Sequence, residues 1–169
     1  MIPTVQTQRL TLRAHVLADY EPFAQLFASD RARYMGGPLS RADSWYGFAA
    51  DTGSWALNGF GCWAVTLSES DRLVGQVGLN HPPHWPEREL GWLLLDGHEG
   101  QGYAYEAASA ARGYAYAKLG WTTVVSYIDP ENARSIALAE RLGARRDADV
   151  TGPDPKDHVY RHPGPEALS

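Results

Sequence analysis

A glycine-rich turn that precedes a helical pattern is the segment best suited to chemistry. The turn carries Gly97, Gly100 and Gly102, and the helical pattern after it has alanines along one face. The first amides of a helix have no intrahelical acceptor and attract anions, and glycines let a phosphate approach without a Cβ in the way. The segment therefore predicts a phosphate-bearing ligand, although a glycine-rich turn without a ligand would have the same sequence.

Two other phosphate-binding patterns fit this turn poorly. A Walker-type loop requires Gly-Lys-Ser/Thr, but the two lysines, Lys118 and Lys156, lie elsewhere. A dinucleotide-binding turn requires a third glycine where Tyr105 stands, and an acidic residue about 20 positions later, where the chain is predicted to be strand. A nicotinamide-nucleotide enzyme is therefore a remote alternative.

Cysteine and histidine give little sign of further chemistry. Cys62 is the single cysteine and lies in an alternating, strand-like stretch, so we expect a small buried side chain rather than a nucleophile. His81, His84 and His98 could form part of a metal site, but the chain has no second cysteine and no His-Glu-x-x-His unit. We expect no metal.

The composition predicts one domain over residues 1–169. The chain is 44% hydrophobic and 21% charged, close to the averages for globular proteins. Its 15 basic and 20 acidic residues give a net charge of −5, which disfavours nucleic acid as a partner. The sequence shows no signal-peptide pattern and no apolar run of about 20 residues, so we expect a cytoplasmic protein that does not span a membrane.

Hydrophobic periodicity predicts the elements that must position the glycine-rich turn. Strands are predicted at 7–13, 62–67, 73–79, 89–95, 121–128 and 158–161. Helices are predicted after Asp19, after Ser40 (a short one, to about Ala49), after Gly102 and after Asn132. This order predicts a mixed α+β domain around one twisted sheet.

Three spaced blocks carry a family resemblance over nearly the whole chain. They are TQRLTLR at 7–13, LGW at 90–92 with GQGYAYEA at 100–107, and NARS at 132–135 with LGA at 142–144. Together they resemble the GNAT superfamily of acetyl-CoA-dependent N-acetyltransferases. Within it, they are most similar to the Rim-type branch, which acetylates the N-termini of ribosomal proteins.

The resemblance implies a largely antiparallel sheet whose two central strands, 89–95 and 121–128, splay apart around acetyl-CoA. It implies that pantetheine pairs with the backbone of Trp92, Leu93 and Leu94. The pyrophosphate would lie on backbone amides of the turn and the helix start, namely Gly100, Gln101, Gly102, Tyr103 and Ala104. Asn132 and Ser135 would approach the pantetheine and the thiol, so that the cofactor is held extended. Homodimers are frequent in this branch, so the resemblance also implies a homodimer.

Two positions depart from the superfamily pattern. Glu99 stands where the pattern has Gln or Arg, and a carboxylate there would repel a pyrophosphate unless it turned to solvent. Ala139 stands where many members place a catalytic Tyr. A tyrosine general acid is therefore not available at this position.

Acyl transfer requires a neutral amine, stabilisation of the oxyanion and a proton for the leaving thiolate. Following the branch pattern, we predict Ser135 as the proton donor, although a serine there can also be a helix cap. We predict Glu89 as the general base, with Glu87 as the runner-up, although a glutamate at a strand edge can simply be exposed. Proton loss to water is a further alternative.

Aromatic residues predict where the acceptor binds. Tyr34, Trp45, Trp55 and Trp85 are candidates for a cleft that holds an amine by cation–π contact. The predicted function is acetyl transfer from acetyl-CoA to a primary amine, either a protein N-terminus or a small molecule. The absence of Tyr at Ala139 keeps open a non-catalytic acyl-CoA-binding regulator, which would bind CoA without releasing it in turnover.

Overall fold

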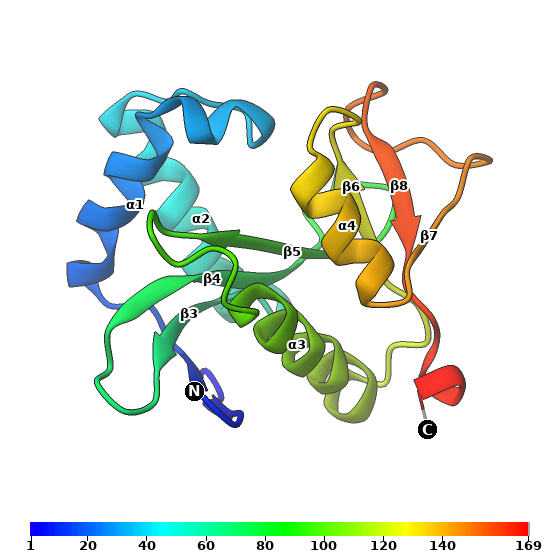
Figure 1. Cartoon of the computed structure of the whole chain (residues 1–169), viewed down its shortest axis with the longest axis horizontal. Helices are drawn as coiled ribbons and strands as arrows, with labels where there is room; N and C mark the ends of the chain where they lie inside the picture. Colours follow the sequence, from blue (N-terminus) through cyan, green and yellow to red (C-terminus); the bar gives the residue numbers. More distant parts are fainter. Residues whose placement is uncertain (169) are drawn as a thin grey trace.

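An eight-stranded sheet runs through the structure, a computed structural model that describes residues 1–168 (Figure 1). The strands lie in the order β1-β2-β3-β4-β5-β6-β8-β7. Their bounds are Val5–Gln6 (β1), Leu10–Arg13 (β2), Cys62–Leu67 (β3), Leu73–Asn80 (β4), Glu89–Leu94 (β5), Val125–Ile128 (β6), Arg145–Arg146 (β7) and His158–Arg161 (β8). The predicted α+β fold class with one sheet is confirmed.

The sheet divides between β5 and β6. All other neighbouring strands pair antiparallel, whereas β5 and β6 are parallel and share one partner pair, Glu89 with Val125. Figure 1 shows the two strands running apart from this pair. Backbone polar groups beyond the split have no partner strand, so a ligand, a side chain or water must satisfy them.

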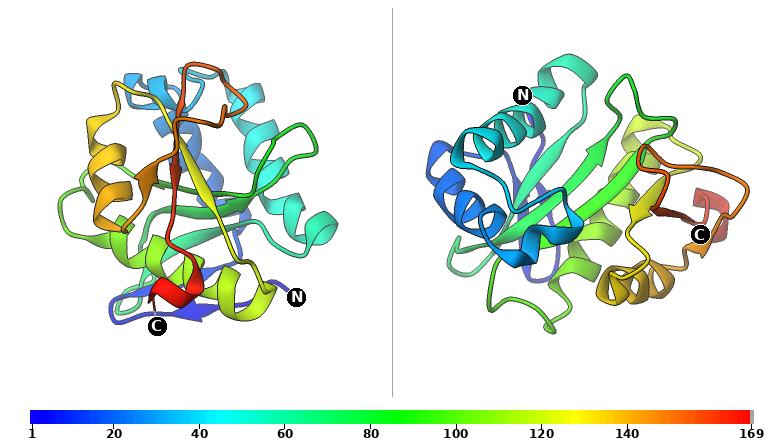
Figure 2. Two further views of the ribbon diagram at one scale, coloured as in Figure 1. Left: turned by 90° about the vertical axis from the view of Figure 1, so that its right-hand side faces the viewer. Right: turned by 90° about the horizontal axis from the view of Figure 1, so that it is seen from above.

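Helices cover both faces of the sheet (Figure 2). α1 (Tyr20–Phe27) and α2 (Arg41–Asn58) pack on one face, while α3 (Tyr103–Leu119) and α4 (Ala133–Arg141) contact each other on the opposite face. Short 3₁₀ helices lie at Leu17–Asp19 (η1), Asp30–Tyr34 (η2) and Pro165–Leu168 (η3). Within residues 1–168, no helix has the length and apolar character needed to cross a bilayer.

Small side chains bring α3 close to the sheet. Ala108, Ala111 and Ala115 are completely buried, as the alanine spacing predicts, and their size permits a close approach to β4 and β5. Ala104 begins the same face but lies in the first turn, where it lines a cavity. The alanine face therefore fixes where the start of α3 meets the split in the sheet.

A carboxylate fastens the start of α3 to the N-terminal segment. Glu106 accepts hydrogen bonds from Thr7 Oγ1 (2.6 Å), Arg9 N (2.8 Å) and Arg9 Nε (2.7 Å). These bonds hold residues 7–9 in a turn, and Thr7 N also donates to Leu10 O (2.9 Å). For this reason the strand predicted at 7–13 begins only at Leu10.

Two further boundaries differ from the prediction, and two short strands were not predicted. The helix expected to end near residue 49 continues to Asn58, because burial of Trp55 offsets the roughly 1 kcal/mol that each internal glycine costs. The strand expected from Trp121 begins at Val125, because Trp121 N still donates to Ala115 O (3.1 Å) at the end of α3. The two-residue strands β1 and β7 are too short for periodicity to reveal.

Asp19 precedes the predicted helix, but its side chain does not cap α1. Its carboxylate instead accepts from Arg13 Nη1 (2.8 Å) and Nη2 (3.0 Å) and from Val16 N (2.9 Å). These hydrogen bonds hold the pKa of Asp19 below its ordinary value against the opposing effect of burial. The residue thus ties the end of β2 to the helix that follows.

Candidate active site

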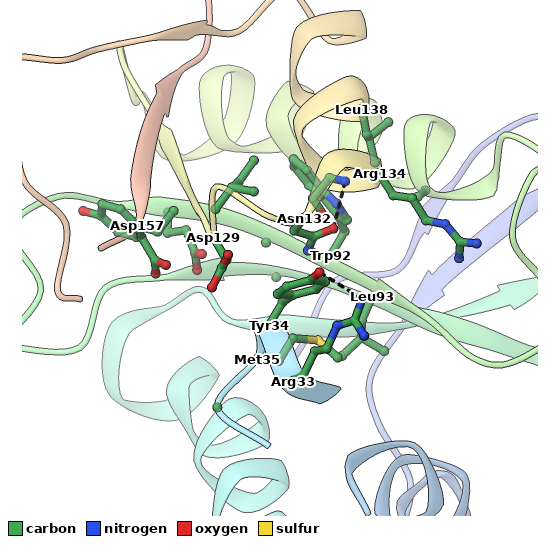
Figure 3. Close-up of a pocket in the computed structure, with 18 of the residues that line it drawn as sticks. Arg33, Tyr34, Met35, Trp92, Leu93, Asp129, Asn132, Arg134, Leu138 and Asp157 are labelled. Atoms are coloured by element: carbon green, nitrogen blue, oxygen red, sulfur yellow. Dashed lines mark hydrogen bonds between the residues drawn. The ribbon is translucent and has the colours of Figure 1, made fainter. Parts of the chain in front are cut away.

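A cavity of about 1560 Å³ lies where β5 and β6 run apart. Its walls come from η2, β5, the turn between β6 and α4, the start of α4 and the loop before β8. Figure 3 shows Trp92 and Leu93 of β5 between the η2 side chains, such as Tyr34, and Asn132 at the start of α4. Elements that are distant in the sequence therefore enclose one space.

The exposed edge of β5 offers backbone groups to this cavity. Leu94 O accepts a hydrogen bond from Arg31 Nη2 (3.1 Å), which lies on the side away from β4. Since backbone groups alternate along a strand, the amide and carbonyl of Trp92 also face the cavity, whereas those of Leu93 face β4. All three residues line the cavity, but Leu93 does so without its backbone polar groups.

The glycine-rich turn leaves the start of α3 open. Gly97, Gly100 and Gly102 have φ of +81°, +76° and +81°, a region that L-residues with side chains rarely adopt. Among residues 1–168, no side chain caps α3, so its first-turn amides have no intrahelical or side-chain acceptor there. Gly100 and Gly102 line a second hollow of about 250 Å³ beside Arg141. The helix start that the sequence predicts as a phosphate cradle is thus open to a ligand.

Glu99 is neutralised by an arginine rather than turned to solvent. Its carboxylate pairs with Arg31 Nη2, and Arg31 Nη1 also reaches Asp96 Oδ1 (3.1 Å). Burial opposes ionisation of Glu99, but backbone amides and the charges of Arg31 and Arg134 hold its pKa below the ordinary value. The ion pair reduces the repulsion that this carboxylate would otherwise exert on a diphosphate.

Asn132 and Ser135 lie together at the start of α4. Asn132 Oδ1 accepts from Ser135 N (3.2 Å) and so caps the helix. Both residues line the cavity. The Ser135 hydroxyl makes no hydrogen bond with any side chain or backbone group of residues 1–168, so it is available to donate a proton. Ala139, one turn further, is fully buried in the core.

Glu89 is a buried carboxyl group at the point where the strands separate. Its residue is only 9% exposed, and Asn80 Nδ2 donates to Glu89 Oε2 (2.9 Å). Burial raises the pKa of Glu89 to about 7, and the charge of Asp51 adds to this effect, while the Asn80 hydrogen bond and the Tyr127 amide oppose it. A base with this pKa exists in both protonation states near neutral pH.

Glu87, the runner-up, is committed to an ion pair. Arg161 Nη1 and Nη2 donate to its two carboxylate oxygens, both at 2.8 Å. Glu87 is not among the described residues that line the cavity, whereas Glu89 is. The geometry therefore favours Glu89 over Glu87 as the base.

The four aromatic candidates separate into two pairs. Tyr34 and Trp85 line the cavity, and Trp85 packs edge-on against Tyr127 with ring centroids 5.5 Å apart. Trp55 is buried in the core, where its indole N–H donates to Cys62 O (2.9 Å). Trp45 packs against Tyr20 on the outer helices. Contrary to the predicted cleft of four aromatic residues, Trp45 and Trp55 are not among the described residues that line the cavity.

Sequence reasoning missed several residues of this site. Asn80 and Tyr127 lie at strand positions that face Glu89, a relation that only the strand register reveals. Asp129 and Asp157 face the same end of the cavity from different loops (Figure 3). Only the two Asp residues carried a signal in the sequence, since each stands in an acidic turn next to a predicted strand. Cys62, predicted to be buried, does lie 2% exposed but borders the cavity.

Comparisons with known proteins identify the family of this fold and site. The family model of the acetyltransferase (GNAT) domain matches residues 9–145, most of the chain. An acetyltransferase from Agrobacterium tumefaciens has a crystal structure 44% identical in sequence, with a TM-score of 0.93 over 96% of this chain and 95% of that one. The chain belongs to the GNAT acetyltransferase family, and it is an acetyltransferase. This family uses acetyl-CoA.

Two more distant structures share the fold alone. One is a spermidine N-acetyltransferase from Vibrio cholerae in complex with CoA and spermine, 19% identical, with a TM-score of 0.72 over 92% of this chain and 94% of that one. The other is RimL, a ribosomal L7/L12 alpha-N-protein acetyltransferase in complex with coenzyme A, 15% identical, with a TM-score of 0.72 over 94% and 95%. The two structures have the same TM-score to this chain, although the proteins are named for different acceptors.

Paired glycine substitutions test the phosphate cradle. Gly100 and Gly97 both have positive φ, and a Cβ added to either meets no atom within 4 Å, but only Gly100 lines the two hollows. We expect both Gly100→Ala and Gly97→Ala to lose about 1–2 kcal/mol of unfolding free energy from strain. Only Gly100→Ala should weaken CoA binding, by about tenfold or more, in isothermal titration calorimetry. Equal CoA affinities in the two folded variants would place the diphosphate elsewhere.

Proposed function

We propose that this acetyltransferase moves an acetyl group from acetyl-CoA to a primary amine, with Glu89 as general base and Ser135 as general acid. The observation that carries the proposal is the buried Glu89 carboxyl group, with a pKa of about 7, in the same cavity as the open start of α3. The cavity thus joins a diphosphate cradle and a proton acceptor. Both are required to bring an activated acyl group to an amine.

The chain's residues fit acetyl-CoA, which supplies the activated thioester. The amides of Tyr103 and Ala104 would hold the diphosphate together with the turn at Gly100, Gln101 and Gly102, because no side chain competes for the start of α3. The Trp92 backbone would hold the pantetheine as an added strand would. Asn132 and Ser135 would then lie beside the thiol end.

Glu89 would accept the proton that the incoming ammonium group must lose. At pH 7 its raised pKa leaves a large fraction ionised, and burial makes it a stronger base than an exposed glutamate. Ser135 would donate its hydroxyl proton to the leaving sulfur at the other end of the reaction. Its uncommitted hydroxyl and its place in the cavity wall support this role.

The acceptor end of the cavity favours a cation. Asp129, Asp154 and Asp157 line it, and Lys156 Nζ lies 3.4 Å from Asp129 and 3.8 Å from Asp154. Burial raises the pKa of Asp157, and the negative charges of Asp154 and Asp129 act in the same direction. Amine acceptors are cations before they react, so this field would draw them in.

Within the family we propose the Rim-type branch, with a protein N-terminus as acceptor. The Asn132–Ser135 motif, assembled here at the cavity wall, supports this assignment. A small amine is the alternative, because the fold is equally similar to the two proteins named for a small and a protein acceptor. A homodimer, a cytoplasmic location and the absence of a nucleic-acid partner remain predictions.

A panel of acceptors tests the function directly. Peptides with free N-termini, polyamines and aminoglycosides are each mixed with acetyl-CoA, and release of the CoA thiol is followed with a chromogenic reagent. We expect steady release with at least one amine, and faster release with the peptides. Tight CoA binding without turnover on any acceptor would instead support a non-catalytic CoA-binding protein, the alternative that Ala139 keeps open.

Replacement of the base tests the catalytic assignment. Glu89→Gln keeps the size and the Asn80 contact but cannot accept a proton, so kcat/KM at pH 8 should fall by about a hundredfold or more. In the wild type, kcat/KM should rise with pH and level off above about pH 7, where Glu89 is ionised. This bend in the pH profile should be absent in Glu89→Gln. Glu87→Gln is the matched control and should keep the bend. A bend that persists in Glu89→Gln would assign the base to another group.

The raised pKa of Glu89 should also make the unfolding free energy depend on pH. The folded protein holds a proton on Glu89 that the unfolded chain releases from about pH 4.5 upward, so the unfolding free energy should fall as pH rises from about 4.5 to about 7. The loss from this carboxyl group amounts to at most about 3 kcal/mol. Glu89→Gln should lack it, as measured by denaturant unfolding at several pH values.

Removal of the Ser135 hydroxyl tests the general acid. Ser135→Ala should lower kcat by about tenfold or more, because the leaving thiolate then takes its proton from water. The CoA dissociation constant should change less than about twofold, since Asn132 Oδ1 still accepts from the backbone N–H of residue 135 and caps the helix. Ser54→Ala on α2 is a control for the loss of a helical serine. If Ser135→Ala has the same kcat as the wild type, the proton of the leaving thiolate comes from another group.

A further inference from the structure

At the split between β5 and β6, a side-chain hydrogen bond takes the place of a backbone hydrogen bond between the strands. At the one partner pair of the two strands, Glu89 with Val125, Val125 N donates to Arg88 O (3.0 Å). In a regular parallel ladder the next rung would run from Tyr127 N to Leu90 O. Instead, Ser126 Oγ donates to Leu90 O at 2.6 Å, and the pairing of the two strands stops.

The Ser126 hydroxyl is the first member of a buried polar network. Ser126 Oγ lies 2.9 Å from His162 Nε2, His162 Nδ1 lies 3.2 Å from Arg112 Nη1, and Arg112 Nη1 donates to Leu142 O (2.7 Å). Because Ser126 gives its proton to Leu90 O, its oxygen must accept from His162 Nε2–H. Nδ1 of His162 is then unprotonated and accepts from Arg112.

Burial and charge keep this proton arrangement in place. Ser126, His162 and Arg112 are each less than 10% exposed. Burial lowers the pKa of His162 to about 3, and the positive charge of Arg112 acts in the same direction, so the imidazole is neutral near pH 7. A neutral ring has one donor and one acceptor, which are the two roles that the geometry requires.

The network ends on Leu90 of β5, a strand that lines the candidate active site. It connects α3, the end of α4, β6 and the segment after β8 to a single carbonyl of β5. His162 also meets the Trp92 ring edge-on, with centroids 6.4 Å apart. On β5, Glu89 precedes Leu90 directly and Trp92 lies two residues after it. The Tyr127 amide lies beyond the last strand pair and favours ionised Glu89.

We propose that Ser126 and His162 are positioning residues that hold β5 and β6 apart at the width acetyl-CoA requires. The Ser126 hydroxyl donates a hydrogen bond to Leu90 O, so this buried carbonyl already has a donor without Tyr127 N. The backbone pairing of β5 and β6 therefore does not extend by another hydrogen bond. His162 holds the hydroxyl in that orientation, and Arg112 holds His162. The inference rests on the proposed function, because it assumes that acetyl-CoA occupies the opening.

The test compares CoA affinity, kinetics and amide exchange in matched variants. Ser126→Ala and His162→Leu should each weaken CoA binding by about tenfold and lower kcat as well, since both the cofactor site and Glu89 shift. In Ser126→Ala, the Tyr127 amide should turn from the Glu89 side chain to Leu90 O and exchange more slowly with solvent, because it then takes part in the ladder. His162→Gln should restore CoA affinity to within about threefold of wild type, because its amide supplies one donor and one acceptor.

A control separates positioning from loss of stability. Tyr116→Phe removes a nearby hydrogen bond, from Tyr116 Oη to Pro163 O (2.8 Å), that is not part of the network. It should lower the unfolding free energy while leaving CoA affinity unchanged. If His162→Leu does not fold, Ser126→Ala, which removes only the Oγ atom, is still expected to weaken CoA binding and lower kcat.

The outcomes distinguish this inference from the function it rests on. A wild-type protein that binds CoA, together with folded Ser126→Ala that binds and turns over equally well, would overturn the positioning role alone. Failure of His162→Gln to restore affinity above His162→Leu would also overturn it. A wild-type protein that binds no CoA would overturn the proposed function, and this inference with it.

Discussion

Backbone hydrogen bonding at the split in the sheet is the constraint on which the rest of this structure depends. A central strand that loses its neighbour exposes amides and carbonyls that must find other partners. Along β5, Leu90 O accepts from the Ser126 hydroxyl and Leu94 O accepts from the Arg31 guanidinium. Between them, the backbone of Trp92 faces the cavity without a partner strand. This open position is where a linear ligand can pair with the strand.

The chemistry of the cavity follows from the same division. Because β6 leaves β5 after one pair of residues, the Glu89 side chain lies at the base of the opening, out of water and beside Asn80. Burial raises its pKa to about 7 there, whereas the exposed start of α3 provides a site for negative charge at the far end. One architectural feature thus places the proposed base and the proposed anion cradle in a single cavity.

Local patterns in the sequence were sufficient for much of this arrangement. The alanine spacing predicted the buried face of α3, the glycines predicted its open start, and the apolar run predicted β5 to within one residue. What the sequence could not show was which side chains meet across strands. The Asn80–Glu89 bond and the Ser126–His162 contact depend on register, and the packing that buries Trp55 but leaves Trp85 at the cavity depends on the whole fold.

Amide hydrogen exchange at two adjacent residues tests the open-strand account most directly. Trp92 N faces the cavity and Leu93 N faces β4, so the two amides differ in partner but not in location. The account predicts that the Trp92 amide exchanges rapidly in the free protein and slowly with saturating CoA, while the Leu93 amide exchanges slowly in both. Slow exchange at Trp92 without CoA, or no change when CoA is added, would contradict it.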